Sequence, residues 1–93
     1  MNILWDDEKN AWLKKERKVS FEEIAVLILE GKYLDIVIHP KRTEQKIFIL
    51  PIKGYTYAIP FVMDKDDNIV LKTAFPSRKF HKKYARRSDE SKT

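Results

Sequence analysis

The sequence predicts an α+β fold with two N-terminal helices, a four-stranded antiparallel meander and a basic C-terminal helix. Three observations support this prediction. A capping box and a helical apolar stripe begin at Ser20, the apolar period changes to two from Tyr33, and an aromatic and basic stretch with helical spacing follows Pro76. Helices before and after a run of strands joined by short turns are typical of the α+β class.

The first helix is expected at about residues 6–18. Asp6 is a good N-cap because its carboxylate can accept a hydrogen bond from an amide of the first turn, and two further acids suit the positive helix end. Trp5, Trp12 and Leu13 share one face of this helix.

The second helix has the clearest signal in the chain. The Ser20 hydroxyl can accept from the amide of Glu23, and the Glu23 carboxylate can accept from the amide of Ser20. Gly31 is expected to end the helix, since glycine readily adopts a left-handed conformation. The apolar stripe between these signals consists of Phe21, Ile24, Ala25, Leu27 and Ile28.

Strands follow from Tyr33 onward, separated by short turns that make neighbours antiparallel. In the first strand, Leu34, Ile36 and Ile38 are expected to share the apolar face. Pro51 and Pro60 cannot donate to a ladder, so each is expected at a strand end, a bulge or an edge. The four strands are expected at residues 33–39, 45–52, 55–63 and 69–75.

The composition limits the chain to one small domain. It has 93 residues, of which 43% are apolar and 35% are charged, too apolar for a disordered chain and too polar for a membrane protein. It has no cysteine, which excludes a disulfide scaffold, a thiol nucleophile and a cysteine zinc site. The acidic start does not resemble a signal peptide, so we expect a cytoplasmic protein. We expect residues 1–87 to form the domain and 88–93 a flexible tail.

Positive charge gathers at the C-terminal end. The formal net charge is +5, and residues 72–87 carry seven bases and no acid. A last helix is expected at about 77–87, with Phe80 and Tyr84 four residues apart anchoring it on the sheet. The opposite side of that helix is basic, which points to a nucleic acid or an acidic protein as partner.

The N-terminal third also resembles a known family. Trp5-Asp6, Lys9 and Val19-Ser20-Phe21-Glu22-Glu23 match, at the same spacing, residues typical of the BrnT-type toxins. These are RelE-like ribonucleases of bacterial type II toxin–antitoxin systems. The resemblance implies a toxin that cleaves RNA without a metal or other cofactor, inhibits translation, and is neutralised by a cognate antitoxin.

The chain departs from the family pattern at several positions. Leu13 stands where the family has an asparagine, and Glu16-Arg17-Lys18 stands for its Lys-His-Gly. Arg17 could replace only the charge of that histidine. Near the C-terminal end only Arg78 and Tyr84 keep the family's character. These departures favour an alternative, a non-enzymatic RNA-, DNA- or antitoxin-binding module that has lost its catalytic residues.

RNA cleavage needs a proton-transfer group and cations that stabilise the phosphorane. His81 is the main candidate, because the cations beside it would favour the neutral imidazole that a general base requires. Arg78 could grip a phosphate through two parallel hydrogen bonds. Lys72, expected to share a strand face with Val70 and Ala74, could also bind phosphate, or it could guard a strand edge. Tyr84 could act as an acid, or it could be a core anchor. The alternative for His81 and Arg78 is an ordinary surface position.

Further basic residues are candidates for binding the nucleic-acid backbone. We also expect an acidic segment of the antitoxin to cover the last helix and bury Arg78, Lys82 and Arg86 in a hetero-oligomer. The backbone-binding candidates are Arg42, Lys79, Lys82, Lys83 and Arg86.

Three other patterns have simpler explanations. Asp64, Asp66 and Asp67 lack the glycine and glutamate of a calcium loop and are expected to form a hairpin turn. His39 is expected to end a strand. The aromatic residues of the third strand could stack on RNA bases, although core packing fits the neighbouring pattern better; they are Tyr55, Tyr57 and Phe61.

Overall fold

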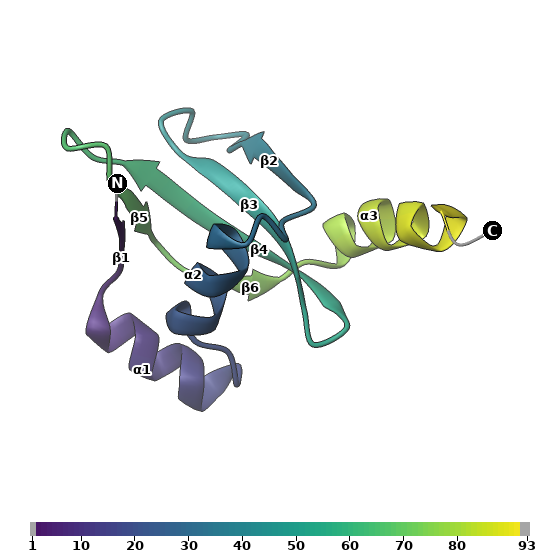
Figure 1. Ribbon diagram of the computed structural model, residues 1–93, viewed down its shortest axis with the longest axis horizontal. Helices are drawn as coiled ribbons and strands as arrows, with labels where there is room; N and C mark the ends of the chain where they lie inside the picture. The colour runs from purple at the N-terminus through teal and green to yellow at the C-terminus, as the bar shows by residue number, and fades with distance from the viewer. Residues whose placement is uncertain (1, 92–93) are drawn as a thin grey trace.

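In the part of the chain that the structure describes, three helices and one mixed sheet make up the fold, so the predicted α+β class is confirmed (Figure 1). The structure is a computed structural model that describes residues 2–91, with side chains described as far as Tyr84. No helix in this part of the chain is both long and apolar enough to cross a membrane. The elements are β1 (Ile3–Leu4), α1 (Asp7–Glu16), α2 (Phe21–Leu29), β2 (Asp35–Ile38), β3 (Lys46–Ile52), β4 (Tyr55–Met63), β5 (Ile69–Leu71), β6 (Phe75–Pro76) and α3 (Arg78–Ser91).

The predicted caps of the first two helices are present. The Asp6 carboxylate accepts from the amide of Lys9 at 2.9 Å, and both hydrogen bonds of the capping box join Ser20 and Glu23. Gly31 has φ +71°, and the amide of the next residue donates to the carbonyl of Leu27 at 2.9 Å. This is a Schellman motif, which supplies partners for the last carbonyls of α2.

Four strands form the predicted meander, in which β2, β3, β4 and β5 pair antiparallel in chain order. The β3–β4 turn has positive φ at both Lys53 and Gly54, as a type I′ turn in a two-residue hairpin requires. The expected strand count is wrong, because β1 pairs parallel to β5 and β6 pairs with β4. A two-residue strand such as β1 has no measurable alternation, so the sequence pattern does not show it.

The predicted strand 69–75 is divided by a bulge. Leu71 lies opposite Phe61 and Phe75 lies opposite Ala58, so this strand advances four residues while β4 advances three. The extra residue falls in the connection that faces Pro60, whose carbonyl accepts from the amide of Lys72 at 2.9 Å. A proline there matches the expectation of a bulge, since it cannot donate to the ladder.

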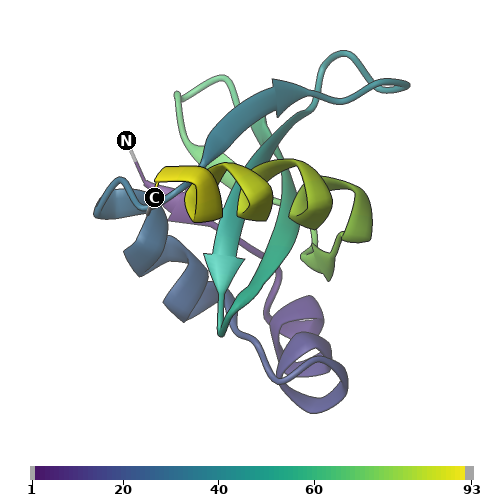
Figure 2. The ribbon, with the colours of Figure 1, turned by 90° about the vertical axis from the view of Figure 1, so that its right-hand side faces the viewer.

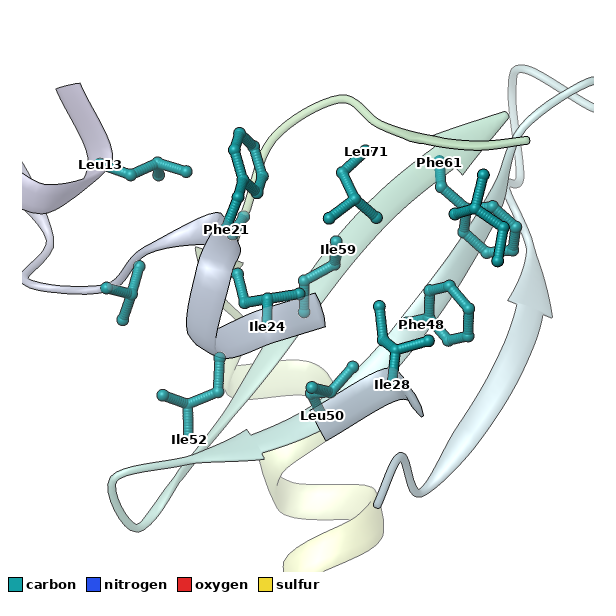
Figure 3. Close-up of a cluster of buried hydrophobic side chains, with 13 residues drawn as sticks. Leu13, Phe21, Ile24, Ile28, Phe48, Leu50, Ile52, Ile59, Phe61 and Leu71 are labelled. Carbon is teal, nitrogen blue, oxygen red and sulfur yellow. The ribbon is translucent and has the colours of Figure 1, made fainter. Parts of the chain in front are cut away.

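The main core lies between the first two helices and one face of the sheet. Phe21, Ile24 and Ile28 of α2 lie in one cluster with side chains from β3, β4 and β5, among them Phe48 and Phe61 (Figure 3). The rings of Phe48 and Phe61 stack with centroids 4.3 Å apart. Leu13 of α1 is fully buried in the same cluster. Burial of these apolar side chains is the largest contribution that stabilises the fold.

The other face of the sheet has a smaller cluster under α3. Tyr84 and Phe80 of that helix pack on Ile47, Ile49 and Ala58, as the aromatic spacing predicted. Figure 2 shows α3 lying across the strands in front of the sheet. Its C-terminal end projects away from the sheet in Figure 1. The predicted helix end near residue 87 is wrong: the helix continues to Ser91, since 88–91 contain no glycine or proline to stop it.

Candidate functional site

The first turns of α3 meet the beginning of β4, and His81 lies at this junction. Its Nδ1 and the Thr56 Oγ1 share a hydrogen bond of 3.0 Å. The imidazole also stacks on the ring of Tyr55, with centroids 4.1 Å apart and planes 21° apart. Thr56 is buried, while His81 and Tyr55 are half-buried. The imidazole is therefore held in one orientation by two neighbouring residues of β4.

Backbone hydrogen bonds fix where α3 begins. The amide of Ser77 donates to the carbonyl of Thr56 at 3.0 Å, which attaches the helix start to β4. The Ser77 hydroxyl accepts from the amide of Phe80 at 3.3 Å, and its carbonyl accepts from the amide of His81 at 2.8 Å. Ser77 is thus the N-cap of α3, and one turn later His81 lies over Thr56.

The site leaves one ring nitrogen of His81 available. Thr56 occupies Nδ1, and no described residue forms a hydrogen bond with Nε2. A half-buried imidazole with one nitrogen fixed and the other open can accept or donate a proton at that second nitrogen. The arrangement can therefore perform proton transfer on a ligand that reaches the start of α3.

The helix brings several of the expected cations together. Arg78 lies one turn before His81 and is exposed, as are Lys79, Lys82 and Lys83. The amines of Lys79 and Lys83 lie 6.0 and 5.4 Å from the centroids of the rings that follow them in the sequence, Phe80 and Tyr84. The side chain of Arg86 lies outside those that the structure describes.

Two expected phosphate-binding residues lie on other elements. Arg42 is exposed in the loop after β2, and Lys72 is exposed in the bulge between β5 and β6. The expectation that Lys72 shares a face with Ala74 is wrong. Ala74 is fully buried in the same cluster as Leu71, which strict alternation would not allow. The bulge shifts the alternation by one residue.

Tyr84 is a packing residue. It is only 3% exposed, and its hydroxyl donates a 2.6 Å hydrogen bond to Asp35 of β2. A phenol so placed anchors α3 on the sheet and does not reach a ligand at the start of the helix. The expectation of Tyr84 as a catalytic acid is therefore replaced by its alternative, the core anchor.

Arg17 also has a structural position. Its guanidinium donates to the carbonyl of Ala74 in the bulge and lies over the ring of Trp12, 4.8 Å from the centroid. Lys9 approaches the same ring at 4.9 Å. Arg17 therefore ties the end of α1 to the sheet, and its charge faces Trp12 and the bulge.

The structure confirms the expected roles of the aspartate-rich loop, as a hairpin turn, and of His39, at the end of a strand. The Asp64 carboxylate accepts hydrogen bonds from the amides of Asp66 and Asn68 and from the Asn68 side chain, so this loop is a hairpin turn. The hydrogen bond from the backbone amide of Asn68 is the main reason why the pKa of Asp64 is lowered, because it stabilises the charged carboxylate. Nδ1 of His39 accepts from the amides of Lys41 and Arg42, so this histidine closes the loop after β2.

The sequence did not indicate the two residues that orient His81, nor the buried polar residue Asn10. Thr56 and Tyr55 hold His81, but they lie 25 and 26 residues before it and no local pattern joins them. Asn10 is 5% exposed and lies three residues before Leu13. The side-chain carbonyl of Asn10 accepts a hydrogen bond from the backbone amide of Phe21, and its side-chain amide donates one to the carboxylate of Glu22. Both distances are 2.8 Å. Helical spacing from Leu13 would have placed Asn10 on the buried face.

Comparisons with known proteins do not assign a function to the chain. The chain matches no protein family, no curated protein and no solved structure. The strongest structural feature is the oriented His81 at the start of a basic helix.

Proposed function

We propose that this protein is a BrnT-type toxin with a RelE-like fold, which cleaves RNA without a metal and thereby inhibits translation. The N-terminal motif, the order of helices and strands, and the basic last helix support the proposal. The observation that carries it is the fixed imidazole of His81, one turn from the exposed guanidinium of Arg78.

In the proposed reaction, the 2′-oxygen of a ribose attacks the adjacent phosphorus and the bond to the 5′-oxygen breaks. With Nδ1–H donating to Thr56, Nε2 of His81 carries the lone pair that accepts the 2′-hydroxyl proton. Water supplies the proton that the departing 5′-oxygen takes up. The products are a 2′,3′-cyclic phosphate and a free 5′-hydroxyl, so no metal or redox partner enters the balance.

Arg78 is assigned to the phosphate. Its two parallel N–H donors suit the non-bridging oxygens, whose charge grows as the phosphorane forms. Lys79, Lys82 and Lys83 extend the positive surface along α3 and are assigned to the neighbouring phosphates. A positioned proton-transfer group contributes a factor of roughly 10²–10⁴ in rate.

The same positive helix is proposed to bind the acidic segment of a cognate antitoxin. The exposed side chains of Arg78, Lys79, Lys82 and Lys83 present no ion pair to a carboxylate among the described residues. Opposite charge on a partner would therefore find them accessible. Such a partner would cover His81 as well, so one segment could neutralise both RNA binding and cleavage.

A second function, RNA or DNA binding without cleavage, is favoured by two observations. Tyr84 is buried against Asp35, and Arg17 is bound to the carbonyl of Ala74. Neither can assist His81 as an acid in this conformation. The binding module predicts nucleic-acid affinity that falls steeply with salt and an His81→Ala variant that behaves as the wild type.

One assay separates the two functions. The chain is purified free of any partner under denaturing conditions, refolded, and incubated with RNA in EDTA. Under the enzymatic proposal, cleavage yields 2′,3′-cyclic phosphate ends, is lost in His81→Ala and is retained in the control His39→Ala, which removes the other histidine. Folded wild-type protein that binds RNA but leaves it intact would refute the enzyme and support the binding module.

A further inference from the structure

Strand β2 ends the sheet, and part of its backbone faces outward. In the order β1-β5-β4-β3-β2, no described strand lies beyond it. The amide of His39 donates to the carbonyl of Gln45 at 3.0 Å, so that residue faces β3. Because the direction alternates along an antiparallel ladder, the backbone groups of Ile36 and Ile38 point away from the sheet. The backbone amide of Ile36 already donates a 2.7 Å hydrogen bond to the Asp35 carboxylate. The backbone amide of Ile38 is therefore the outward-pointing donor that β2 can offer to another strand.

The side chains on this strand are apolar and exposed. Ile36 and Ile38 lie on the strand face that was expected to be apolar, and 40% and 65% of their surfaces are accessible. The reason is that α2 ends at Leu29, itself 77% exposed, before it covers β2. Proteins usually guard an edge strand with lysine, proline or a bulge, and residues 35–38 contain none of these. We call the following residues the β2 edge surface: Leu29, Tyr33, Leu34, Ile36 and Ile38.

A groove continues from this surface across the sheet. It measures about 510 Å³ and is lined mainly by apolar side chains from the second half of α2 and from the strands β1, β2, β3 and β5. Leu29, Tyr33 and Ile36 belong to both the groove and the β2 edge surface. An extended segment paired with β2 could therefore place apolar side chains into the groove while its backbone continues the sheet. The large apolar and aromatic side chains that line the groove include Trp5, Ile28, Leu29, Tyr33, Ile36 and Phe48.

Positive charge lies at both ends of β2. Lys32 precedes the strand, and Lys41, Arg42 and Lys46 follow it; all four are exposed. Of the nearby acids, Glu30 lies 4.0 Å from Lys32, Asp35 accepts from Tyr84 on the other face of the sheet, and Glu44 is exposed in the loop that contains Lys41 and Arg42. Cations therefore outnumber acids around the apolar edge, which favours a ligand with acidic ends.

We infer that the β2 edge surface binds an extended segment of a partner protein, with apolar residues at alternate positions and acidic residues at its ends. The segment adds to the sheet as a further strand beside β2. In the register that pairs the outward backbone groups of Ile36 with those of Ile38, the charges disfavour a second copy of this chain. A two-fold pairing that sets Ile36 opposite Ile38 also sets Lys32 opposite Arg42 at both ends, so like charges meet.

This inference does not depend on the proposed ribonuclease. The β2 edge surface contains none of the residues around His81, and it lies on the α2 side of the sheet, whereas His81 belongs to α3. Loss of RNA cleavage would leave it unchanged, and loss of strand binding would leave the His81 site unchanged.

The test uses two synthetic peptides that share a Thr-Val-Thr-Val-Thr core. One has Asp-Glu at both ends and the other has Lys-Lys. Each is titrated into the isotope-labelled full chain and followed by amide chemical shifts and hydrogen exchange. We expect the acidic peptide to shift β2 resonances and to protect the Ile38 amide, and to bind about tenfold more tightly than the lysine peptide.

Variants of the edge make the test specific. Ile38→Pro removes the outward N–H without breaking a bond to β3, and Ile38→Lys replaces it if proline prevents folding. Either change is expected to weaken the acidic peptide roughly tenfold. The control Val26→Lys, which charges another exposed apolar position on α2, is expected to bind as the wild type. Equal binding of both peptides, or unchanged binding by the Ile38 variant, would overturn the inference. So would a dimer in sedimentation that the Ile38 variant converts to monomer, because the occupant would then be a second copy.

Discussion

The hydroxyl of Tyr84 donates a 2.6 Å hydrogen bond to a carboxylate oxygen of Asp35, and this bond joins α3 to the edge strand β2. The other carboxylate oxygen of Asp35 accepts from the amide of Ile36. One aspartate therefore orients the last helix and organises the beginning of β2. The link explains how α3 is held above the sheet although it extends beyond it in Figure 1.

Tyr84→Phe is expected to lower the free energy of unfolding by about 1–2 kcal/mol, because a hydrogen bond to a carboxylate is lost while the ring remains packed. Urea denaturation measures the change, and amide exchange should show faster opening of α3. The control is Tyr33→Phe, at an exposed tyrosine. RNA cleavage per folded molecule should be retained in Tyr84→Phe; a loss of cleavage without a loss of stability would restore Tyr84 as a catalytic acid.

Thr56→Val tests the orientation of His81. Valine matches threonine in shape but cannot hydrogen-bond Nδ1, so we expect cleavage to fall roughly three- to tenfold, as a lost bond of about 1 kcal/mol implies. His81→Ala should fall by roughly 10²–10⁴. The tautomer of His81, read from imidazole nitrogen chemical shifts, should become mixed in Thr56→Val.

The nearby Thr73→Val, at a half-buried threonine in the bulge, is the matched control and should leave the tautomer of His81 unchanged. A Thr56→Val protein with wild-type tautomer and wild-type cleavage would show that Tyr55 alone orients the ring.

Arg78→Ala tests the assignment of the phosphate. We expect weaker RNA binding and a salt dependence whose slope, in log K against log salt concentration, decreases by about 0.7 for one lost phosphate contact. Arg78→Lys keeps the charge but not the paired donors, so it should keep the slope and lose cleavage rate. Lys65→Ala, in the 64–68 hairpin, is the control. If it changes the slope as much as Arg78→Ala does, binding is a diffuse property of the surface.

The elements that the sequence predicted well are those with local signals. The capping box at Ser20, the stop at Gly31 and the strand turns each depend on residues a few positions apart. The anchoring of α3 by Phe80 and Tyr84 also followed from their spacing. These interactions need no knowledge of distant chain segments.

The missed features depend on distant residues. β1 forms because the backbone of Asn2 meets Asn68 and Ile69, and the site forms because Thr56 meets His81. The bulge at Lys72 reverses the predicted face of Ala74. The candidate site was therefore predicted in its cations and histidine, and missed in the residues that orient the histidine.

The contact between Asn10 and Glu22 predicts a specific response to acid. The hydrogen bond from the Asn10 side chain is the main cause of a lowered pKa at Glu22, with a smaller contribution from the charge of Lys14. A carboxyl whose pKa is lower in the folded chain stabilises the fold above the ordinary value of 4.5. That contribution is lost as the pH falls below 4.5 through the folded pKa.

Glu22→Gln removes this titration while its amide oxygen can still accept from Asn10. We expect its unfolding free energy to fall less steeply than that of the wild type between pH 4.5 and the folded pKa of Glu22, as urea denaturation at several pH values measures. Glu44→Gln, at an exposed glutamate in the loop after β2, serves as the control. Asn10→Ala should cost about 1–3 kcal/mol at neutral pH, because the buried amide of Phe21 loses its acceptor. Parallel pH curves for Glu22→Gln and the wild type would mean that the contact does not shift the titration of Glu22 in solution.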